Sequence, residues 1–239
     1  MNSPGEVRSP RSDATRVLIL SVAERLFAEQ GVFAVSNRKI SEAAGLGNTT
    51  AVNYHFGTKT DLILAIAASH GARIEKQRAQ LMAKVEGSTD LRDWVACMVQ
   101  PSTSHLKDLG NPSWYARFNA QILTDPHLRV LVYEEGWKVS PSFQTLMAGF
   151  ASVVTDYPIH VRRMRADIAR HLMVHMCAER ELLLSREPAP VTSTWDRFAV
   201  DLVDAIVAVW QVPPRRDGEI DGLISEPPER VGPANDATK

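Results

Sequence analysis

Apolar side chains recur every three or four residues along most of the chain, and this spacing limits the possible folds more than any other feature. It is typical of helices that bury one face. We find no run in which apolar and polar residues alternate, no Asn-Gly hairpin signal and no internal repeat. The sequence therefore predicts an all-α fold. Clear examples are Ile19, Ala23, Leu26 and Phe27 near one end, and Trp195, Phe198, Leu202, Ile206 and Val209 near the other.

Glycines divide the first sixty residues into three helices. Gly31, Gly45 and Gly57 each follow the last turn of an apolar pattern, where glycine most easily adopts the left-handed conformation that ends a helix. Two short helices separated by a tight glycine turn indicate a helix-turn-helix module. The predicted helices run from Asp13 to Gln30, from Ser36 or Asn37 to Gly45, and from Gly47 or Asn48 to Phe56.

The first third of the chain resembles the TetR family of bacterial repressors. The family pattern is a helix ending in Leu-Phe-Ala-x-x-Gly, then Ile-Ala-x-x-Ala-Gly-Val, a short recognition helix, and Tyr-x-(Tyr/His)-Phe-x-(Ser/Asn)-Lys-x-x-Leu. The resemblance implies a dimeric DNA-binding regulator, with repression as the family's usual mode. The matching residues are Leu26-Phe27-Ala28 with Gly31, Ile40-Ser41 with Ala44-Gly45-Leu46, and Asn53-Tyr54-His55-Phe56 with Lys59 and Leu62.

Three positions depart from the family pattern. Ser41 replaces a common alanine, a change that should be tolerated. Gly47 stands where a serine or threonine usually caps the recognition helix, so Asn48 or Thr49 is expected to provide the cap. Asn53 occupies a frequent tyrosine position, and its amide can pair with an adenine edge instead of contacting a phosphate.

Short polar side chains gather on the predicted recognition helix. Such a helix lies in the major groove and directs these groups toward base edges, while helix N-termini attract phosphate. Tyr54, His55 and Lys59 resemble the family's backbone-contacting cluster, and Arg38 is placed to reach a phosphate or a guanine. The expected DNA contacts are Ser36, Arg38, Asn48, Thr49, Thr50, Asn53, Tyr54, His55 and Lys59.

Other roles are open for some of these residues. Tyr54 could belong to the core, and Arg38 and Lys59 could be solvated surface charges. The formal net charge is −1, so any DNA binding must come from a local basic patch. Because one module supplies few basic groups, useful affinity requires two modules in a dimer.

A long fourth helix, from Thr58 or Thr60 to about Val85, is expected to lead into a second domain. Gly71 is a candidate bend, and Pro101 is expected to kink or end the following helix. Later helices are expected at about 90–106, 113–123, 127–137, 141–154, 162–184 and 194–211. The predicted division is a disordered arm (1–12), a helix-turn-helix domain (13–60), a ligand-binding and dimerisation domain (61–211) and a disordered, proline-rich tail (212–239).

The resemblance implies a small-molecule pocket in the second domain and self-pairing through the last two helices. For the last helix, the alternative is an ordinary intramolecular core. Arg117 is interpreted as a surface charge rather than the partner of an acidic ligand. The expected dimer contacts are Met164, Ile168, Trp195, Phe198, Leu202, Ile206 and Val209. The expected ligand contacts are Trp94, Met98, Trp114, Phe118, Met147, Phe150, His171 and His175.

Nothing in the sequence indicates catalysis. His171, His175 and Glu179 lie four residues apart, but three ligands on one straight helix span about 12 Å, too far for one metal ion. Cofactors and metals are therefore not expected, and the protein is not expected to be an enzyme. The two cysteines are far apart, and no apolar run suits a membrane span or a signal peptide. We expect a cytoplasmic protein whose partners are double-stranded operator DNA, a small-molecule effector and a second copy, with no membrane.

Overall fold

The computed structural model describes residues 10–48, 50–186 and 194–214, and within them it contains ten α-helices and no strand. The expected all-α fold is confirmed. The helices are α1 (Pro10–Gln30), α2 (Asn37–Ala43), α3 (Ala51–Phe56), α4 (Lys59–Met82), α5 (Leu91–Leu109), α6 (Tyr115–Thr124), α7 (Pro126–Val139), α8 (Pro141–Val153), α9 (Ile159–Arg186) and α10 (Trp195–Gln211).

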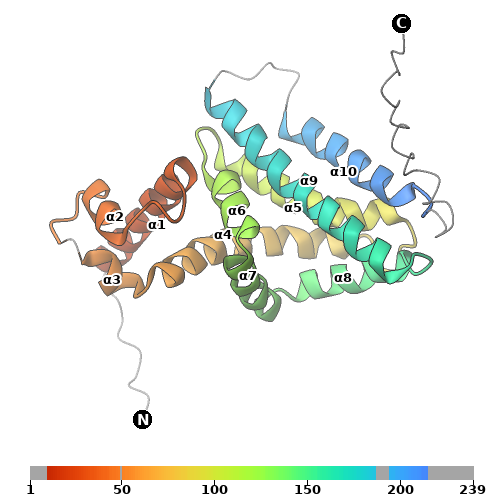
Figure 1. Cartoon of the computed structure of the whole chain (residues 1–239), viewed down its shortest axis with the longest axis horizontal. Helices are drawn as coiled ribbons and strands as arrows, with labels where there is room; N and C mark the ends of the chain where they lie inside the picture. Colours follow the sequence, from red (N-terminus) through yellow and green to blue (C-terminus); the bar gives the residue numbers. More distant parts are fainter. Residues whose placement is uncertain (1–9, 49, 187–193, 215–239) are drawn as a thin grey trace, which may run out of the picture.

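The first three helices form a small unit at one end of the molecule, and α5 to α10 form a larger bundle (Figure 1). Helix α4 begins beside α3 and continues into the bundle, where it packs against α5 and α8. The core of the small unit is fully buried, since Phe27, Ile40 and Val52 have no exposed surface. Burying side chains of this size is the main source of stability for such a unit.

Local signals fix the ends of the helices in the small unit. The Ser36 hydroxyl accepts a hydrogen bond from the N–H of Lys39 and caps α2. Thr58 and Asp61 form a reciprocal capping box at the start of α4, so Thr58 is the residue before the helix. Gly45 in the turn between α2 and α3 has a φ of +65°, a conformation that costs little only for glycine.

Side chains of α6 join the small unit to the bundle. The amide nitrogen of Gln121 donates to the carbonyl of Phe27 at 2.8 Å, and its amide oxygen accepts from the N–H of Val32 at 2.8 Å. The Phe118 ring stacks on Phe27 with 6.0 Å between ring centroids. One glutamine therefore satisfies backbone groups on both sides of the turn after α1 and holds it against α6.

A buried carboxylate organises the start of α6. Glu181 of α9 is 1% exposed and accepts hydrogen bonds from the Ser113 hydroxyl, from the N–H groups of Ala116 and Arg117, and from the Arg117 guanidinium. The expectation that Arg117 is a surface charge is wrong, because its guanidinium lies 3.1 Å from this buried carboxylate. An acid at a helix N-terminus also complements the helix dipole.

Several boundaries differ from those expected. Helix α1 begins at Pro10, so residues 10–12 of the expected disordered arm are helical; residues 1–9 lie outside the described part of the chain. Helix α4 ends at Met82, α9 is longer at both ends, and most of the expected tail also lies outside the described residues. Pro101 does not end α5, because buried residues on both sides, Val99 and Leu106 among them, keep the helix continuous despite the lost N–H.

Candidate nucleic-acid interface and the cavity of the helical bundle

Helix α3 presents one polar face to solvent and buries the other. Val52 and Phe56 are buried on the core side, whereas Asn53 and Tyr54 are exposed. The alternative that Tyr54 belongs to the core is wrong, because 83% of its surface is exposed; its ring is in edge contact with the His55 ring. The exposed phenol and amide are therefore available to an external partner.

Asn53 is held in place by the preceding helix. Its Oδ1 accepts a hydrogen bond of 2.6 Å from the Nδ2 of Asn37, at the start of α2. An amide oxygen has two lone pairs and the nitrogen has two hydrogens. One acceptor site and both donors thus remain, which is the complement needed to pair with an adenine edge.

The turn before α3 is shaped by Asn48. Its Oδ1 accepts from both the N–H and the hydroxyl of Thr50, at 2.9 and 2.7 Å. This turn explains why α3 begins at Ala51 rather than at Gly47 or Asn48, because Asn48 and Thr50 are committed to the turn. Thr50 precedes the helix without a side-chain cap, and Thr49 lies outside the described residues.

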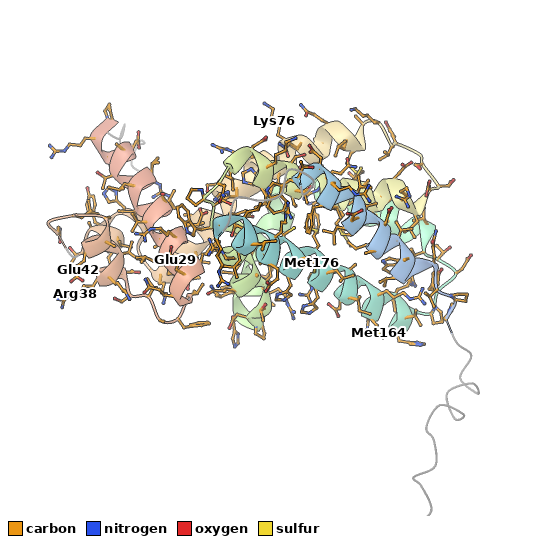
Figure 2. The ribbon with its side chains drawn as sticks, turned by 90° about the horizontal axis from the view of Figure 1, so that it is seen from above. Glu29, Arg38, Glu42, Lys76, Met164 and Met176 are labelled. Atoms are coloured by element: carbon orange, nitrogen blue, oxygen red, sulfur yellow. The ribbon has the colours of Figure 1, made fainter. Side chains whose placement is uncertain are left out.

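The two basic side chains expected to contact DNA, Arg38 and Lys59, differ in the intramolecular interactions that they already make. Arg38 is exposed but pairs with Glu42 at 2.7 Å on the same helix (Figure 2), and this pairing raises the pKa of Arg38. The Lys59 ammonium lies 5.8 Å from the centre of the Phe27 ring, and partial burial lowers the pKa of Lys59. Arg38 must therefore exchange an intramolecular partner for a phosphate if it contacts DNA.

Arg16 supports the far end of α3 and was missed in the sequence. Its Nη1 donates to the carbonyl of His55 at 2.8 Å, and its guanidinium lies 4.0 Å from the centre of the Phe56 ring. The carbonyl near a helix C-terminus lacks an intrahelical donor, and an arginine supplies one. Because 39 residues separate Arg16 from His55, no local pattern could have revealed this contact.

A cavity of about 580 Å³ lies within the bundle. Its size suits a small organic molecule. Three of the expected ligand contacts line it, Met98, Met147 and Phe150. The other lining residues are Arg78, Leu123, Arg129, Phe143, Leu146, Ala166, Asp167, Ala169, Arg170, Met173, Val174 and Trp210.

The remaining expected ligand contacts lie elsewhere. Phe118 is fully buried against Phe27, and Trp94 is buried in a cluster with Leu146, where it packs directly on Gly149. Trp114 is the residue before α6. His171 and His175 stack on each other on the exposed side of α9 and do not line the cavity. None of these five residues lines this cavity, and Phe118 and Trp94 belong to the core because aromatic side chains fill cores as readily as they line pockets.

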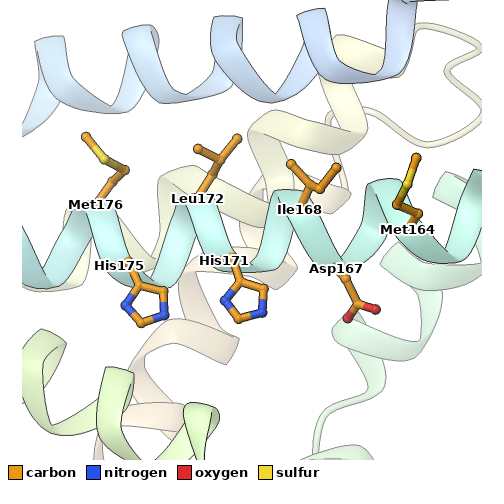
Figure 3. A pocket seen from close by; sticks show the side chains of 7 residues that line it. All are labelled: Met164, Asp167, Ile168, His171, Leu172, His175 and Met176. Atoms are coloured by element: carbon orange, nitrogen blue, oxygen red, sulfur yellow. The ribbon is translucent and has the colours of Figure 1, made fainter. Parts of the chain in front are cut away.

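The exposed side of α9 carries a shallow apolar groove (Figure 3). Four apolar residues run along it, and His171, His175 and Asp167 lie in the neighbouring row. We call the first set the α9 row; it consists of Met164, Ile168, Leu172 and Met176. Met164 is 56% exposed and Ile168 is 39% exposed. A continuous patch of exposed large apolar side chains is unusual on the surface of a soluble protein.

The apolar stripe of α10 faces the inside of the subunit. Trp195, Leu202 and Ile206 have exposures of 9%, 5% and 0%, and α10 packs mainly on α5. Phe198 and Val209 are half-buried, and Phe198 packs against the same core. The expectation that Trp195, Leu202 and Ile206 contact a second subunit is therefore wrong, because α5 already covers them.

Two further observations concern the described residues. No group of three or more histidine, cysteine, aspartate and glutamate side chains is close enough to hold a metal ion. None of the ten helices is both long enough and apolar enough to cross a bilayer.

A buried core behind an exposed polar face, on two short helices joined by a tight turn, defines a helix-turn-helix DNA-binding protein. Residues 19–66 match the sequence profile of the tetR family of bacterial regulatory proteins. The match assigns this module, residues 19–66, to the DNA-binding part of tetR-family regulators. No curated protein sequence matches the chain significantly.

Several solved structures resemble the chain at low sequence identity. A chain from Shewanella sp. PV-4, assigned to the tetR family of transcription regulators, is 16% identical with a TM-score of 0.50; the match covers 82% of this chain and 95% of that one. PfmR from Thermus thermophilus is 14% identical with a TM-score of 0.48, covering 80% and 97%. NalD, a repressor of the MexAB-OprM multidrug efflux pump in Pseudomonas aeruginosa, is 21% identical with a TM-score of 0.47, covering 82% and 97%.

Proposed function

We propose that the protein is a homodimeric repressor that leaves a palindromic operator when a small, largely apolar molecule binds. Residues 13–60 form the DNA-binding unit, and residues 61–211 form the ligand-binding and dimerisation unit. The observation that carries the DNA-binding role is the exposed pair Asn53 and Tyr54 on α3, backed by the buried Val52 and Phe56. The proposed location is the cytoplasm, where the operator DNA would be, and no catalytic step is proposed.

The DNA contacts follow from the geometry of α2 and α3. Asn53 reads a base edge, while Tyr54 and Lys59 contact the backbone on one side of the groove. Ser36 and Arg38, at the start of α2, contact phosphate on the other side. Asn48, Thr49, Thr50 and His55 are the remaining proposed DNA contacts.

The α9 row is the proposed dimer interface. Its exposed apolar side chains, Met164, Ile168 and Met176, would be removed from water by the same row of a second subunit. A two-fold interface of this kind places two recognition helices in a symmetric arrangement. Successive major grooves on one face of DNA are about 34 Å apart, so the dimer must hold the two α3 helices at roughly that spacing.

Helix α4 couples the cavity to the DNA-binding unit. It begins with the Thr58 cap beside α3 and carries Arg78 at the cavity wall. A ligand weakens DNA binding only if it binds the DNA-incompetent form more tightly than the competent one. The proposed role of α4 is to change its angle between these two forms.

A gel-shift titration with the native upstream DNA tests the proposal. The wild-type protein should bind a palindromic site with an affinity that falls as salt is raised, since phosphate contacts release counterions. Asn53→Ala and Tyr54→Ala should each weaken binding by about tenfold or more, because each removes a base or phosphate contact. Lys84→Ala, an exposed change outside the DNA-binding unit, should leave binding unchanged. Absence of salt-sensitive binding to any palindrome, or wild-type affinity in both α3 variants, would contradict the DNA-binding role.

A further inference from the structure

The charged groups that line the cavity are mostly of one sign. Arg78 of α4, Arg129 of α7 and Arg170 of α9 are set against a single acid, Asp167. Arg170 and Asp167 neutralise each other, with 2.9 Å between nitrogen and oxygen. Arg129 forms no ion pair with any residue in the described ranges. An otherwise apolar cavity therefore contains excess positive charge.

Arg78 is only partly compensated by its neighbour Glu75. Nitrogen and oxygen are 3.3 Å apart, and Glu75 also accepts hydrogen bonds from the N–H and hydroxyl of Ser142 and from the Ser140 hydroxyl. Its charge is thus shared among several donors at the start of α8. Burial lowers the pKa of Arg78 in spite of Glu75. The cost of removing the guanidinium from water is therefore larger than the stabilisation that Glu75 provides.

Two buried donors on the cavity wall lack acceptors within the described part of the chain. They are the Nε of Arg78 and the indole Nε1 of Trp210, whose side chain is 1% exposed. Buried polar groups are normally hydrogen-bonded, so each exception needs an explanation. Both groups can only donate, which means that a partner must supply acceptor oxygens.

From this charge and these donors, we propose that the cavity binds an amphipathic molecule with one oxyanion head group, a carboxylate or a phosphate. The head lies between Arg78 and Arg129 and accepts from Trp210, and the apolar body packs on Met98 and Met147. Planar guanidinium groups match both head groups with paired hydrogen bonds. The inference rests on the proposed function only in taking this cavity as the effector site.

Isothermal titration calorimetry of the full-length protein at pH 7.5 tests the choice of ligand. The probes are octanoate, octyl phosphate, octanol and octylamine, which share one apolar chain and differ in the head group. At least one anion should bind tenfold or more tightly than octanol, and octylamine should bind most weakly. The tighter of the two anions identifies the head group as a carboxylate or a phosphate.

Two pairs of variants locate the binding site. Arg129→Gln should weaken anion binding by about tenfold and leave octanol binding unchanged, whereas Arg163→Gln, on the exposed surface of α9, should change neither. Met147→Asp places a carboxylate at the partly exposed mouth of the cavity and should reverse the preference toward octylamine. Met147→Asn, of the same size without the charge, should keep the preference for anions.

The inference is overturned if the alcohol or the amine binds as tightly as the anions, if no probe binds, or if Arg129→Gln and Arg163→Gln behave alike. Circular dichroism of each variant shows whether it is folded. If Arg129→Gln is unfolded, the comparison of Met147→Asp with Met147→Asn decides whether the cavity prefers anions. Gel shifts on the same samples keep the two proposals apart. Intact DNA binding with no anion selectivity rejects only the ligand class, whereas loss of DNA binding in the wild type rejects the proposed function.

Discussion

Four side chains from four helices meet at the junction between the small unit and the bundle. Nδ1 of the half-buried His70 lies 2.7 Å from Nε2 of His105, and its Nε2 lies 2.8 Å from the Glu24 carboxylate. The Tyr115 ring stacks on His70 with 3.9 Å between ring centroids. The pKa of His105 is lowered from 6.5 to about 4, chiefly by burial and also by His70 and Arg73, against a smaller opposing effect of Asp108. The junction is therefore built around an uncharged His105.

Acid should weaken this junction. The unfolded chain protonates His105 near pH 6.5 and the folded one near pH 4, so between these values the unfolded state binds more protons and stability falls as the pH falls. At pH 5 this group alone should reduce the free energy of unfolding by about 2 kcal/mol relative to pH 7.5. Urea denaturation at both pH values, on the wild type and on His105→Gln, measures the difference.

The comparison isolates His105 from other groups that titrate in acid. His105→Gln should lose less stability between pH 7.5 and pH 5 than the wild type does, by about the same 2 kcal/mol. His127→Gln, an exposed change at the start of α7, should behave as the wild type does. An equal loss in all three proteins would show that His105 accepts its proton without penalty in the folded state.

At the scale of elements, the junction between α5 and α8 depends on one glycine. A Cβ atom at Gly149 would lie 2.0 Å from the Trp94 ring, which is far inside van der Waals contact. Trp94 is itself anchored by a hydrogen bond of 3.0 Å from its indole N–H to the carbonyl of Ser88. Neither partner can move away easily, so the close approach of the two helices requires glycine.

Replacing Gly149 with alanine should destabilise the protein, the opposite of what a Gly→Ala change usually does within a helix. Within a helix, Gly→Ala normally stabilises by about 0.5–1 kcal/mol. Gly149→Ala should instead destabilise by roughly 1–3 kcal/mol, the cost of overpacking a filled core. Gly71→Ala in α4 is the matched control, since nothing lies within 4 Å of the added atom, and it should stabilise the protein. Thermal unfolding in which both variants become more stable would refute the close contact.

The sequence predicted where the helices lie better than it predicted what each helix packs against. The four-residue and three-residue spacing of Leu202, Ile206 and Val209 identifies α10, yet an apolar stripe does not specify whether it meets a neighbouring helix or a second subunit. The recognition helix was predictable because its signal is local. Arg78, Arg129 and Arg170 were missed since each lies on a different helix and only folding brings them to one cavity.

At the scale of the whole molecule, the α9 row is a continuous apolar surface that the described part of the subunit leaves exposed. It lies on the outer side of the bundle, and Figure 2 shows Met164 and Met176 at its two ends. A continuous patch of this kind is typical of a protein interface. The proposed dimer therefore depends on a few side chains whose replacement costs the isolated subunit little.

A charge in the centre of the α9 row should separate the subunits. Ile168→Asp buries two unpaired carboxylates at the two-fold interface and should shift the protein from dimer to monomer in sedimentation velocity. Val130→Asp, an exposed apolar residue on α7, should leave the dimer intact. A dimer that persists in Ile168→Asp would place the interface elsewhere on the bundle.

Helix α4 has the geometry of a lever arm. At 1.5 Å per residue, about 28 Å separate Lys59 from Arg78, so a tilt of about 5° at the cavity end displaces the other end by about 2.5 Å. Successive bases along a strand are about 3.4 Å apart, which makes such a displacement comparable to the repeat being read. In a two-fold dimer the two α3 helices are displaced in opposite directions, so their separation changes by the sum of the two displacements. A small tilt of α4, which leaves both cores intact, is therefore enough to take the two α3 helices away from the spacing of successive major grooves.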